Sequence, residues 1–330
     1  MSDISNEKLE LSTVILIKEA QNRNIQVDIL DAGENFIRLK KGDKVEYIKQ
    51  ATKTSLDSYI APLIMENKLV TKIILGENGF NVPKGTVVKS KEEAEIHWKD
   101  FCDKGVVIKP KNTNFGIGIT ILLEHYSKEQ YIKGVELALE HDDTVLIEEY
   151  ISGKEYRFLV LGDEVAGILH RIPANVKGDG IHTIEELVEE KNKNPLRGEG
   201  HLTPFEKINL GKVEMDFLSS QGRTIKDIPK EGETVFLREN SNISTGGESI
   251  DFTDEIIQEY KDIAVGASKA VGAKICGVDM IIKDIYEKPS QDNHSIIELN
   301  FNPAIYIHDL PYEGKNRYVE KKLLDLLGFK

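Results

Sequence analysis

Two apolar segments near the carboxyl end of the chain carry acidic and amide groups where buried strands normally carry hydrocarbon. The segment Gly277–Ile282 contains Asp279, and the segment Ser295–Phe301 contains Glu298 and Asn300. Residues two apart on a strand face the same side, so the side chains of Glu298 and Asn300 converge. A carboxylate inside an apolar strand is costly unless it is paired with a cation or bound to a metal ion. The two segments therefore predict strands that gather around a cation.

The chemistry of these three side chains narrows the choice of cation. An Asp, a Glu and an Asn offer only oxygen ligands, which suit Mg²⁺ bridging phosphates better than Zn²⁺. The alternative is an ordinary salt bridge between a carboxylate and a basic neighbour. Because two separate apolar strands carry the feature, the metal site is the favoured interpretation.

Length and composition set the frame for this site. A chain of 330 residues can bury several cores, and its mixture of helices, strands and hairpins indicates α+β subdomains around a cleft. The formal net charge of −13 opposes binding to a nucleic-acid backbone. The start of the chain lacks the basic segment of a signal peptide, and the apolar runs are too short to span a membrane. Cys102 and Cys276 have no metal-ligand spacing, so we expect a soluble cytoplasmic protein with two free thiols.

A polar loop, Lys111–Gly118, follows the short β-branched strand that ends at Lys109. The loop is neither a Walker A sequence nor a dinucleotide-binding fingerprint. Gly116 and Gly118 would let the backbone approach a polyphosphate closely, and Lys109 would supply a fixed positive charge. An ordinary hairpin loop is the alternative interpretation.

Two further segments carry groups suited to a nucleotide. The strand Val145–Tyr150 ends in Glu148 and Glu149, with Glu155 and Arg157 close behind, and such a strand end could hold adenine and ribose; a solvated acidic turn is the alternative. The segment Leu237–Gly247 is rich in hydrogen-bonding groups and contains Arg238, whose planar guanidinium could steady a developing phosphoryl charge. A surface loop is the alternative for that segment.

The order of these features resembles that of the ATP-grasp superfamily. It runs from a lysine at a strand end through a glycine-containing loop and a strand end suited to adenine to an Asp and then a Glu-x-Asn sequence. The chain more closely resembles the glutathione synthetase module of bacterial bifunctional enzymes that fuse glutamate–cysteine ligase to glutathione synthetase, and cyanophycin synthetase more distantly. The resemblance covers nearly the whole chain from Leu11, and its most specific stretches are Lys49–Ser55, Pro62–Lys68, Arg171–Val176, Arg238–Gly247 and Glu298–Pro303.

The resemblance implies an ATP-grasp fold with the nucleotide in a cleft between two α+β subdomains. The expected parts are an amino-terminal α/β subdomain (1–82), a central lid subdomain (83–150) and a carboxy-terminal subdomain with the metal and substrate site (151–330). Arg238 would be catalytic. The resemblance assigns ATP to Lys72, Lys109, Asn112, Gly116, Gly118, Glu148, Glu149, Ile151 and Glu155; the metal to Asp279, Glu298 and Asn300; and the peptide substrate to Arg171, Asn175, Asn242 and Gly247.

The implied reaction joins γ-glutamylcysteine to glycine with ATP and two Mg²⁺ ions, with Mn²⁺ as an alternative metal. Another amino acid or dipeptide pair, a non-catalytic ATP-binding regulator and a small-molecule kinase are the competing interpretations. Relatives of this kind are often homodimers. The chain begins where the linker of the fusion enzymes would end, so we expect either a stand-alone relative that takes γ-glutamylcysteine from a separate glutamate–cysteine ligase, or an enzyme that joins a different pair of substrates. His308 is expected to be a structural hydrogen-bonding residue rather than a base. Changing Asp279 or Glu298 to Ala is expected to abolish ADP formation and to leave the fold intact.

Overall fold

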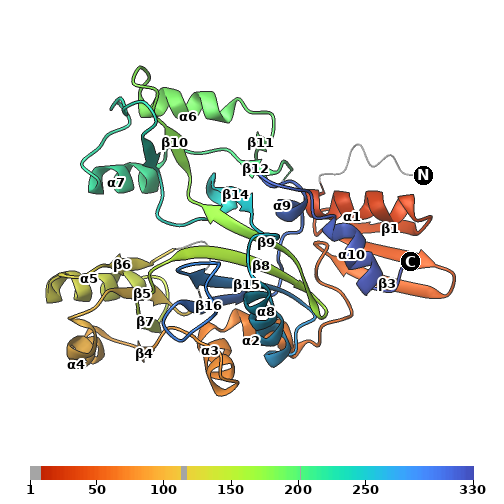
Figure 1. The fold of residues 1–330 in the computed structure, drawn as a ribbon, viewed down its shortest axis with the longest axis horizontal. Helices are drawn as coiled ribbons and strands as arrows, with labels where there is room; N and C mark the ends of the chain where they lie inside the picture. The colour runs from red at the N-terminus through yellow and green to blue at the C-terminus, as the bar shows by residue number, and fades with distance from the viewer. Residues whose placement is uncertain (1–8, 113–116, 201) are drawn as a thin grey trace. The chain divides into compact units, whose positions relative to one another are not determined.

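The computed structural model describes residues 9–112, 117–200 and 202–330, which form a mixture of helices and strands (Figure 1). The backbone of these residues divides into two units, each built from separate stretches of the chain. Unit 1 comprises the residues up to Leu56, Ala166–Thr253 and Asn302–Lys330, and unit 2 comprises Asp57–Val165 and Asp254–Phe301. The three-part division predicted from the sequence stays a prediction.

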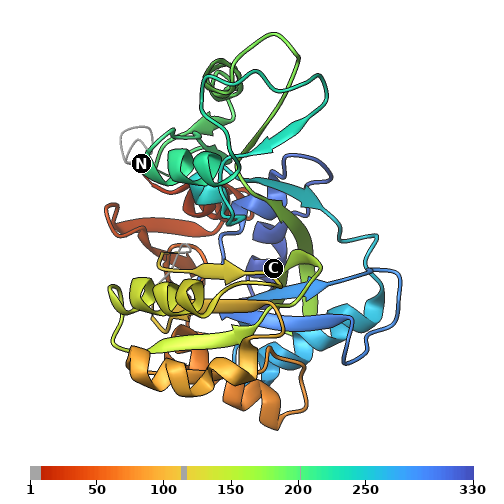
Figure 2. The ribbon, with the colours of Figure 1, turned by 90° about the vertical axis from the view of Figure 1, so that its left-hand side faces the viewer.

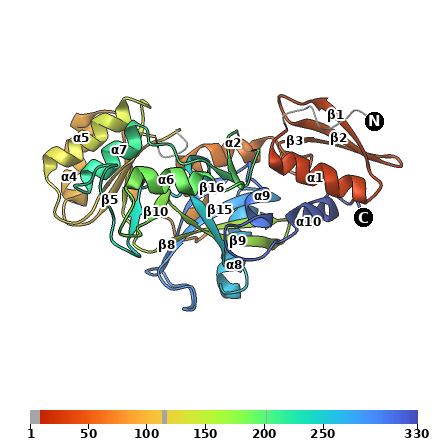
Figure 3. The ribbon, with the colours of Figure 1, turned by 90° about the horizontal axis from the view of Figure 1, so that it is seen from above.

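The first part of unit 1 is a helix packed against a small antiparallel sheet. Helix α1 (Leu11–Asn22) precedes strands β1 (Gln26–Asp31), β2 (Phe36–Lys41) and β3 (Lys44–Lys49), which lie in the order β1-β2-β3. Alternate apolar residues of the strands face the helix because a strand exposes successive side chains on opposite sides. The carboxy-terminal helix α10 (Val319–Leu326) lies beside α1 (Figures 1 and 3). The side chains buried here include Leu16, Ile17, Ile37, Leu39 and Ile48.

The rest of unit 1 consists of short strands and helices around a second core. Strand β9 (Glu164–Ile172) pairs with β14 (Glu248–Asp251), and β10 (Asn175–Lys177) pairs with β13 (Thr234–Phe236), both antiparallel. The other elements are β11 (Arg197–Gly198), β12 (Phe205–Glu206), α6 (Ile184–Asn192), α7 (Lys212–Ser220), the 3₁₀ turn η2 (Ile243–Thr245) and α9 (Tyr306–Asp309). One buried apolar cluster among these elements contains Ala174, Val176, Ile184, Val188, Ile208, Leu218, Val235 and Leu237, and another contains Leu169, Phe205, Ile243, Tyr306 and Ile307.

Unit 2 contains a four-stranded antiparallel sheet in the order β4-β7-β5-β6. Two helices cover one face of it, and their first turns are fixed by Ser90 and Ser127, whose side chains accept hydrogen bonds from backbone N–H groups. The strands are β4 (Gly85–Val88), β5 (Val106–Pro110), β6 (Thr120–Leu122) and β7 (Val145–Glu149), and the helices are α4 (Lys91–Phe101) and α5 (Lys128–Leu139). In Figure 2 they lie in the orange to yellow-green part of the ribbon.

Unit 2 also contains three long antiparallel strands, with β15 (Ile275–Ile282) between β8 (Lys154–Leu161) and β16 (His294–Asn300). Helices α2 (Ile60–Glu66), α3 (Lys68–Glu77) and α8 (Gln258–Ala270) pack against these strands (Figure 1). In the parts of the chain that the structure describes, no helix combines the length and the apolar character needed to cross a membrane.

Candidate functional site

The three predicted metal ligands lie together in unit 2, on one face of the β8-β15-β16 strands. The register places Arg157, Asp279 and Glu298 directly opposite one another on the three strands. Residues opposite one another in an antiparallel sheet project from the same face. Asn300, two residues beyond Glu298, brings its Nδ2 to 3.3 Å from Oδ2 of Asp279. Two carboxylates and one amide therefore meet on this face.

A β-bulge keeps this alignment. The register shifts between Asp279 and Met280, so that Met280 lies opposite Ile296 while Asp279 lies opposite Glu298. Ile297 is the extra, unpaired residue of the bulge. It allows Asp279 to lie opposite Glu298 while the apolar residues beyond the bulge remain paired with one another. No pattern in the sequence indicates the bulge.

Asp279 is paired with a basic neighbour even without a metal. Its side chain is 1% exposed, and the Arg157 guanidinium donates from Nε to Oδ1 and from Nη2 to Oδ2, the latter over 2.7 Å. Burial opposes the charged guanidinium, but the Asp279 carboxylate outweighs it and holds the pKa of Arg157 above its ordinary value. The salt bridge and the gathering of oxygen ligands, posed as alternatives from the sequence, are both present.

A second charged cluster of unit 2 lies on the β5-β7 sheet and on α3. Lys109 and Glu148 occupy diagonal positions on neighbouring strands, on the face opposite the helix-covered core. Nζ of Lys109 is 3.0 Å from Oε2 of Glu148, and Lys72 of α3 donates to Oε1 of the same carboxylate. The side chains of the two lysines are each 11% exposed, and that of Glu148 is 5% exposed. The cluster brings together both lysines predicted to bind ATP, Lys72 and Lys109, and one of the residues predicted to hold adenine, Glu148.

The charges of this cluster determine which lysine loses its proton first. Burial, followed by the positive charge of Lys109, lowers the pKa of Lys72 to about 7. Burial would raise the pKa of Glu148, but the two lysines hold it below its ordinary value. The pKa of Lys109 is raised, because Glu148 outweighs the effect of burial. Two cations share one carboxylate, which leaves excess positive charge available to an anion.

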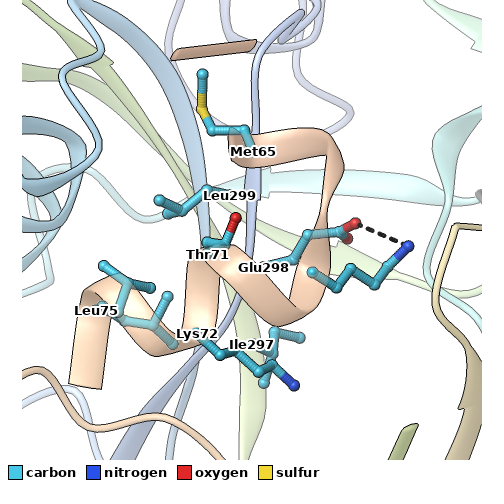
Figure 4. Close-up of a pocket in the computed structure, with 9 residues that line it drawn as sticks. Met65, Thr71, Lys72, Leu75, Ile297, Glu298 and Leu299 are labelled. Atoms are coloured by element: carbon cyan, nitrogen blue, oxygen red, sulfur yellow. Dashed lines mark ion pairs between the residues drawn. The ribbon is translucent and has the colours of Figure 1, made fainter. Parts of the chain in front are cut away.

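Lys68 extends this cluster toward the metal-ligand candidates. It lies one helical turn before Lys72 on α3, and its Nζ is 3.8 Å from Oε1 of Glu298 (Figure 4). Asn67 fixes the start of the helix by accepting a hydrogen bond from the Val70 N–H. A small pocket lies between the helices and β16, lined by Met65, Lys68, Thr71, Lys72, Leu75, Ile296, Ile297, Glu298 and Leu299. Lysines and an acidic residue thus share one pocket within unit 2.

The remaining ATP-site predictions fall around the ends of β5, β7 and β8. The Glu149 carboxylate accepts a hydrogen bond from the Lys84 N–H at 3.1 Å, and Asn112 donates its N–H to Asp142 at 2.8 Å. Gly118 has φ +73°, and an added Cβ would lie 2.7 Å from His141. Ile151 follows β7 and is half-buried. Glu155 lies two residues before Arg157 on β8 and projects from the same face of the sheet. Gly116 lies outside the described residues.

The predicted catalytic and peptide-binding residues all lie in unit 1. Arg238 pairs with Glu214 of α7. Asn175 donates to the carboxylate of Glu248 at 3.4 Å. Arg171 lies on β9, opposite Ser249; Asn242 precedes η2; and the backbone of Gly247 is crowded by the carbonyl oxygens of Asn242 and Ile172, each 2.8 Å from an added Cβ.

Sequence reasoning missed Lys68 and Glu214 as site residues, and it noted Arg157 beside Glu155 without giving it a role. Arg157 stands two residues after Glu155 on a strand, and Lys68 stands four before Lys72 on a helix, so periodicity alone could have placed both on the site face. Glu214 lies 24 positions from Arg238, and no local pattern links the two. Cys102 and Cys276 are free thiols, and burial raises the pKa of Cys276 to about 12. His308 is fully buried in α9.

Comparisons with known proteins give two family matches along the chain. Residues 7–60 match the ATP-grasp-like domain, and residues 77–194 match the D-ala D-ala ligase C-terminus. Among solved structures, a bifunctional glutathione synthetase from Pasteurella multocida is 47% identical with a TM-score of 0.76, and the match covers 97% of this chain and 44% of that one. The VanG D-Ala:D-Ser ligase from Enterococcus faecalis shares the fold, with a TM-score of 0.51 at 17% identity over 83% of this chain and 64% of that one.

Curated relatives carry the name glutathione biosynthesis bifunctional protein GshAB. The protein from Clostridium perfringens is 60% identical over 98% of this chain and 42% of its own length. The one from Desulfotalea psychrophila is 53% identical over 97% of this chain and 41% of its own length. The chain thus spans about two fifths of these relatives. The predicted fold class is confirmed: the chain has the α+β ATP-grasp fold and belongs to the ATP-grasp superfamily.

Proposed function

We propose that the chain is an ATP-dependent, ADP-forming carboxylate–amine ligase that joins γ-glutamylcysteine to glycine and so makes glutathione. The observation that supports this most directly is the gathering of Asp279, Glu298 and Asn300 beside a lysine cluster that reaches Glu298 through Lys68. The identity of 60% to a glutathione biosynthesis protein supports the choice of substrates.

The side chains fit a divalent cation in their chemistry. In the described ranges no three His, Cys, Asp or Glu side chains gather in a way that could hold a metal ion, so the proposed site needs the Asn300 amide as its third ligand. Rotating that amide would turn its oxygen toward the carboxylates. Bound Mg²⁺ would neutralise phosphate charge; Asp279, Glu298 and Asn300 would hold it, and two ions, or Mn²⁺, are part of the proposal.

ATP fits the second cluster of unit 2. When Lys72 is protonated, Lys68, Lys72 and Lys109 carry three positive charges against the carboxylates of Glu148 and Glu298, and a polyphosphate would take up the excess. We assign the nucleotide to the predicted residues around them: Asn112, Gly116, Gly118, Glu148, Glu149, Ile151 and Glu155. In this assignment the loop that ends at Gly118 closes over the phosphates and excludes water.

The reaction has two steps. The carboxylate of the acid substrate attacks the γ-phosphate of ATP, which gives an acyl phosphate and ADP. The amine of glycine then attacks the acyl carbon and phosphate leaves. Proximity and fixed positive charge supply most of the rate, since phosphoryl transfer asks little covalent chemistry of the protein. Arg238 is assigned to stabilise the transferring phosphoryl group; Arg171, Asn175, Asn242 and Gly247 are assigned to the peptide substrate.

The setting of the reaction is part of the same proposal. We place the reaction in the cytoplasm, because the two cysteines of the chain are free thiols and its proposed substrates are small molecules. We infer that a separate glutamate–cysteine ligase activity supplies the dipeptide; the relatives are bifunctional by their printed name. A homodimer is the proposed assembly.

The test is a turnover assay with ATP, Mg²⁺, γ-glutamylcysteine and glycine, with mass detection of glutathione and measurement of ADP. We expect one ADP per glutathione and no ADP above background when either substrate is left out. ADP release with other acid and amine pairs, but none with this pair, would refute the proposed substrates. A stable phosphorylated product would instead identify a kinase.

A further inference from the structure

A strained turn in unit 1 has no role in the function proposed so far. Gln50 and Ala51 have φ of 52° and 64°, in the left-handed region that residues other than Gly, Asn and Asp seldom adopt. Ala51 and Thr52 are both fully buried. Such strain persists only where the surrounding structure holds it, and it gathers at functional sites. The turn lies within Lys49–Ser55, one of the stretches that carry the family resemblance.

The side chains of the turn converge on one residue, Asn302. The Thr52 hydroxyl donates to Oδ1 of Asn302 over 2.9 Å, and Nδ2 of Asn302 donates to Oε1 of Gln50 over 3.3 Å. Gln50 is itself fixed, because Lys53 donates to the same oxygen over 2.6 Å and the Gln50 amide donates to Glu10 over 3.1 Å. Both ends of the Asn302 amide are therefore held, and its orientation is determined.

Asn302 lies in the chain between a proposed metal ligand and residues that pack near the proposed peptide loop. It follows Asn300, a proposed metal ligand, by two residues. A few residues later, Tyr306 and Ile307 join the apolar cluster that also contains Ile243 of η2. Ile243 directly follows Asn242, in the loop to which the peptide substrate is assigned. The segment held by the turn thus connects, along the chain, a metal ligand with the packing beneath the peptide loop.

We propose that the turn Gln50–Thr52 is a positioning element for the peptide substrate, with Thr52 as its positioning residue. It acts through Asn302: the hydrogen bond fixes the segment 302–307, and that segment supports the Asn242–Gly247 loop through Ile243. The inference rests on the proposed function, because it concerns the binding of that enzyme's acid substrate. ATP binding does not depend on it, since the lysine cluster lies in unit 2.

The test compares three variants of the full chain in the glutathione assay. Thr52→Val keeps the shape and removes the hydroxyl, Thr52→Ser restores it, and Thr183→Val is a matched control. Thr183 also lies in unit 1, where its hydroxyl caps α6, and losing this cap lowers stability without touching Asn302. We expect Thr52→Val to raise the KM for γ-glutamylcysteine about five- to tenfold, the worth of one buried hydrogen bond. The KM for ATP should stay within about twofold of that of the unmodified chain, because the lysine cluster lies in unit 2. Thr52→Ser should recover the KM for γ-glutamylcysteine.

The outcomes separate the inference from the function beneath it. If the unmodified chain makes glutathione but Thr52→Val lowers only the Tm, or Thr183→Val raises the peptide KM equally, the turn supports folding alone and the inference is wrong. If the unmodified chain makes no glutathione while forming ADP with another pair, the proposed substrates fail and the positioning role for this dipeptide fails with them.

Discussion

The buried pair of Arg157 and Asp279 allows the metal site and the stability of the fold to be tested separately. The two side chains are 10% and 1% exposed. Removing one partner of a buried ion pair typically costs about 3–5 kcal/mol, because the other charge is left unpaired in a medium of low dielectric constant. We therefore expect Asp279→Ala to lose about 3–5 kcal/mol of unfolding free energy together with ADP formation. The structure thus changes the expectation, drawn from the sequence, that this substitution would leave the fold intact.

Glu298→Ala is the matched comparison on the neighbouring strand. The Glu298 side chain is 34% exposed, and its nearest cation, Lys68, is 3.8 Å away. A solvated pair at that distance contributes at most about 1 kcal/mol. Loss of ADP formation with nearly unchanged stability is the expected result, since Glu298 serves the metal more than the fold.

Urea denaturation gives the unfolding free energies, and ADP release at saturating Mg²⁺ gives the activities. A double variant, Arg157→Met with Asp279→Leu, should recover most of the stability lost in Asp279→Ala, because no charge is left buried, and should stay inactive. The reasoning is refuted if Asp279→Ala and Glu298→Ala cost the same free energy, or if either variant turns over at the rate of the unmodified chain.

Two further predictions concern pH. Because the pKa of Lys72 is about 7 when folded and its ordinary value is 10.5, the folded chain binds fewer protons between these values and this residue's contribution to stability rises with pH. The phosphates need the protonated amine of Lys72, so the KM for ATP should rise above pH 7. In a Lys72→Arg variant the KM for ATP should not change between pH 6 and pH 8. If it rises with pH as in the unmodified chain, Lys72 is not the group that titrates. The pKa of Asp309 is raised to about 8 by burial and by Glu320, so the stability that its proton provides is complete below its ordinary value of 3.8 and is lost as pH rises toward 8. Asp309→Asn keeps a neutral group there and should gain about 1–2 kcal/mol over the unmodified chain at pH 8 in urea denaturation, with no gain near pH 4.

Elements with complete local signals were predictable from the sequence. Helix α4 (Lys91–Phe101) is one of them, since Ser90 caps it and acidic residues follow in its first turn. The helical pattern of the sequence already starts at Thr253, but α8 begins only at Gln258. Thr253 is held instead by Asp251, to which its hydroxyl and its N–H both donate, and this contact ends β14.

The sequence by itself determined the chemistry of the site: oxygen ligands on two apolar strands, lysines ahead of them, and a glycine loop. Alternation along a strand and turns along a helix are local, so one stretch suffices to place residues on a face. Tertiary structure alone decided the register that sets Asp279 opposite both Glu298 and Arg157. It also decided that the turn at Thr52 holds Asn302, 250 positions away. Partners so distant are chosen by packing and by the pairing of buried polar groups, which depend on the whole fold and leave no local pattern.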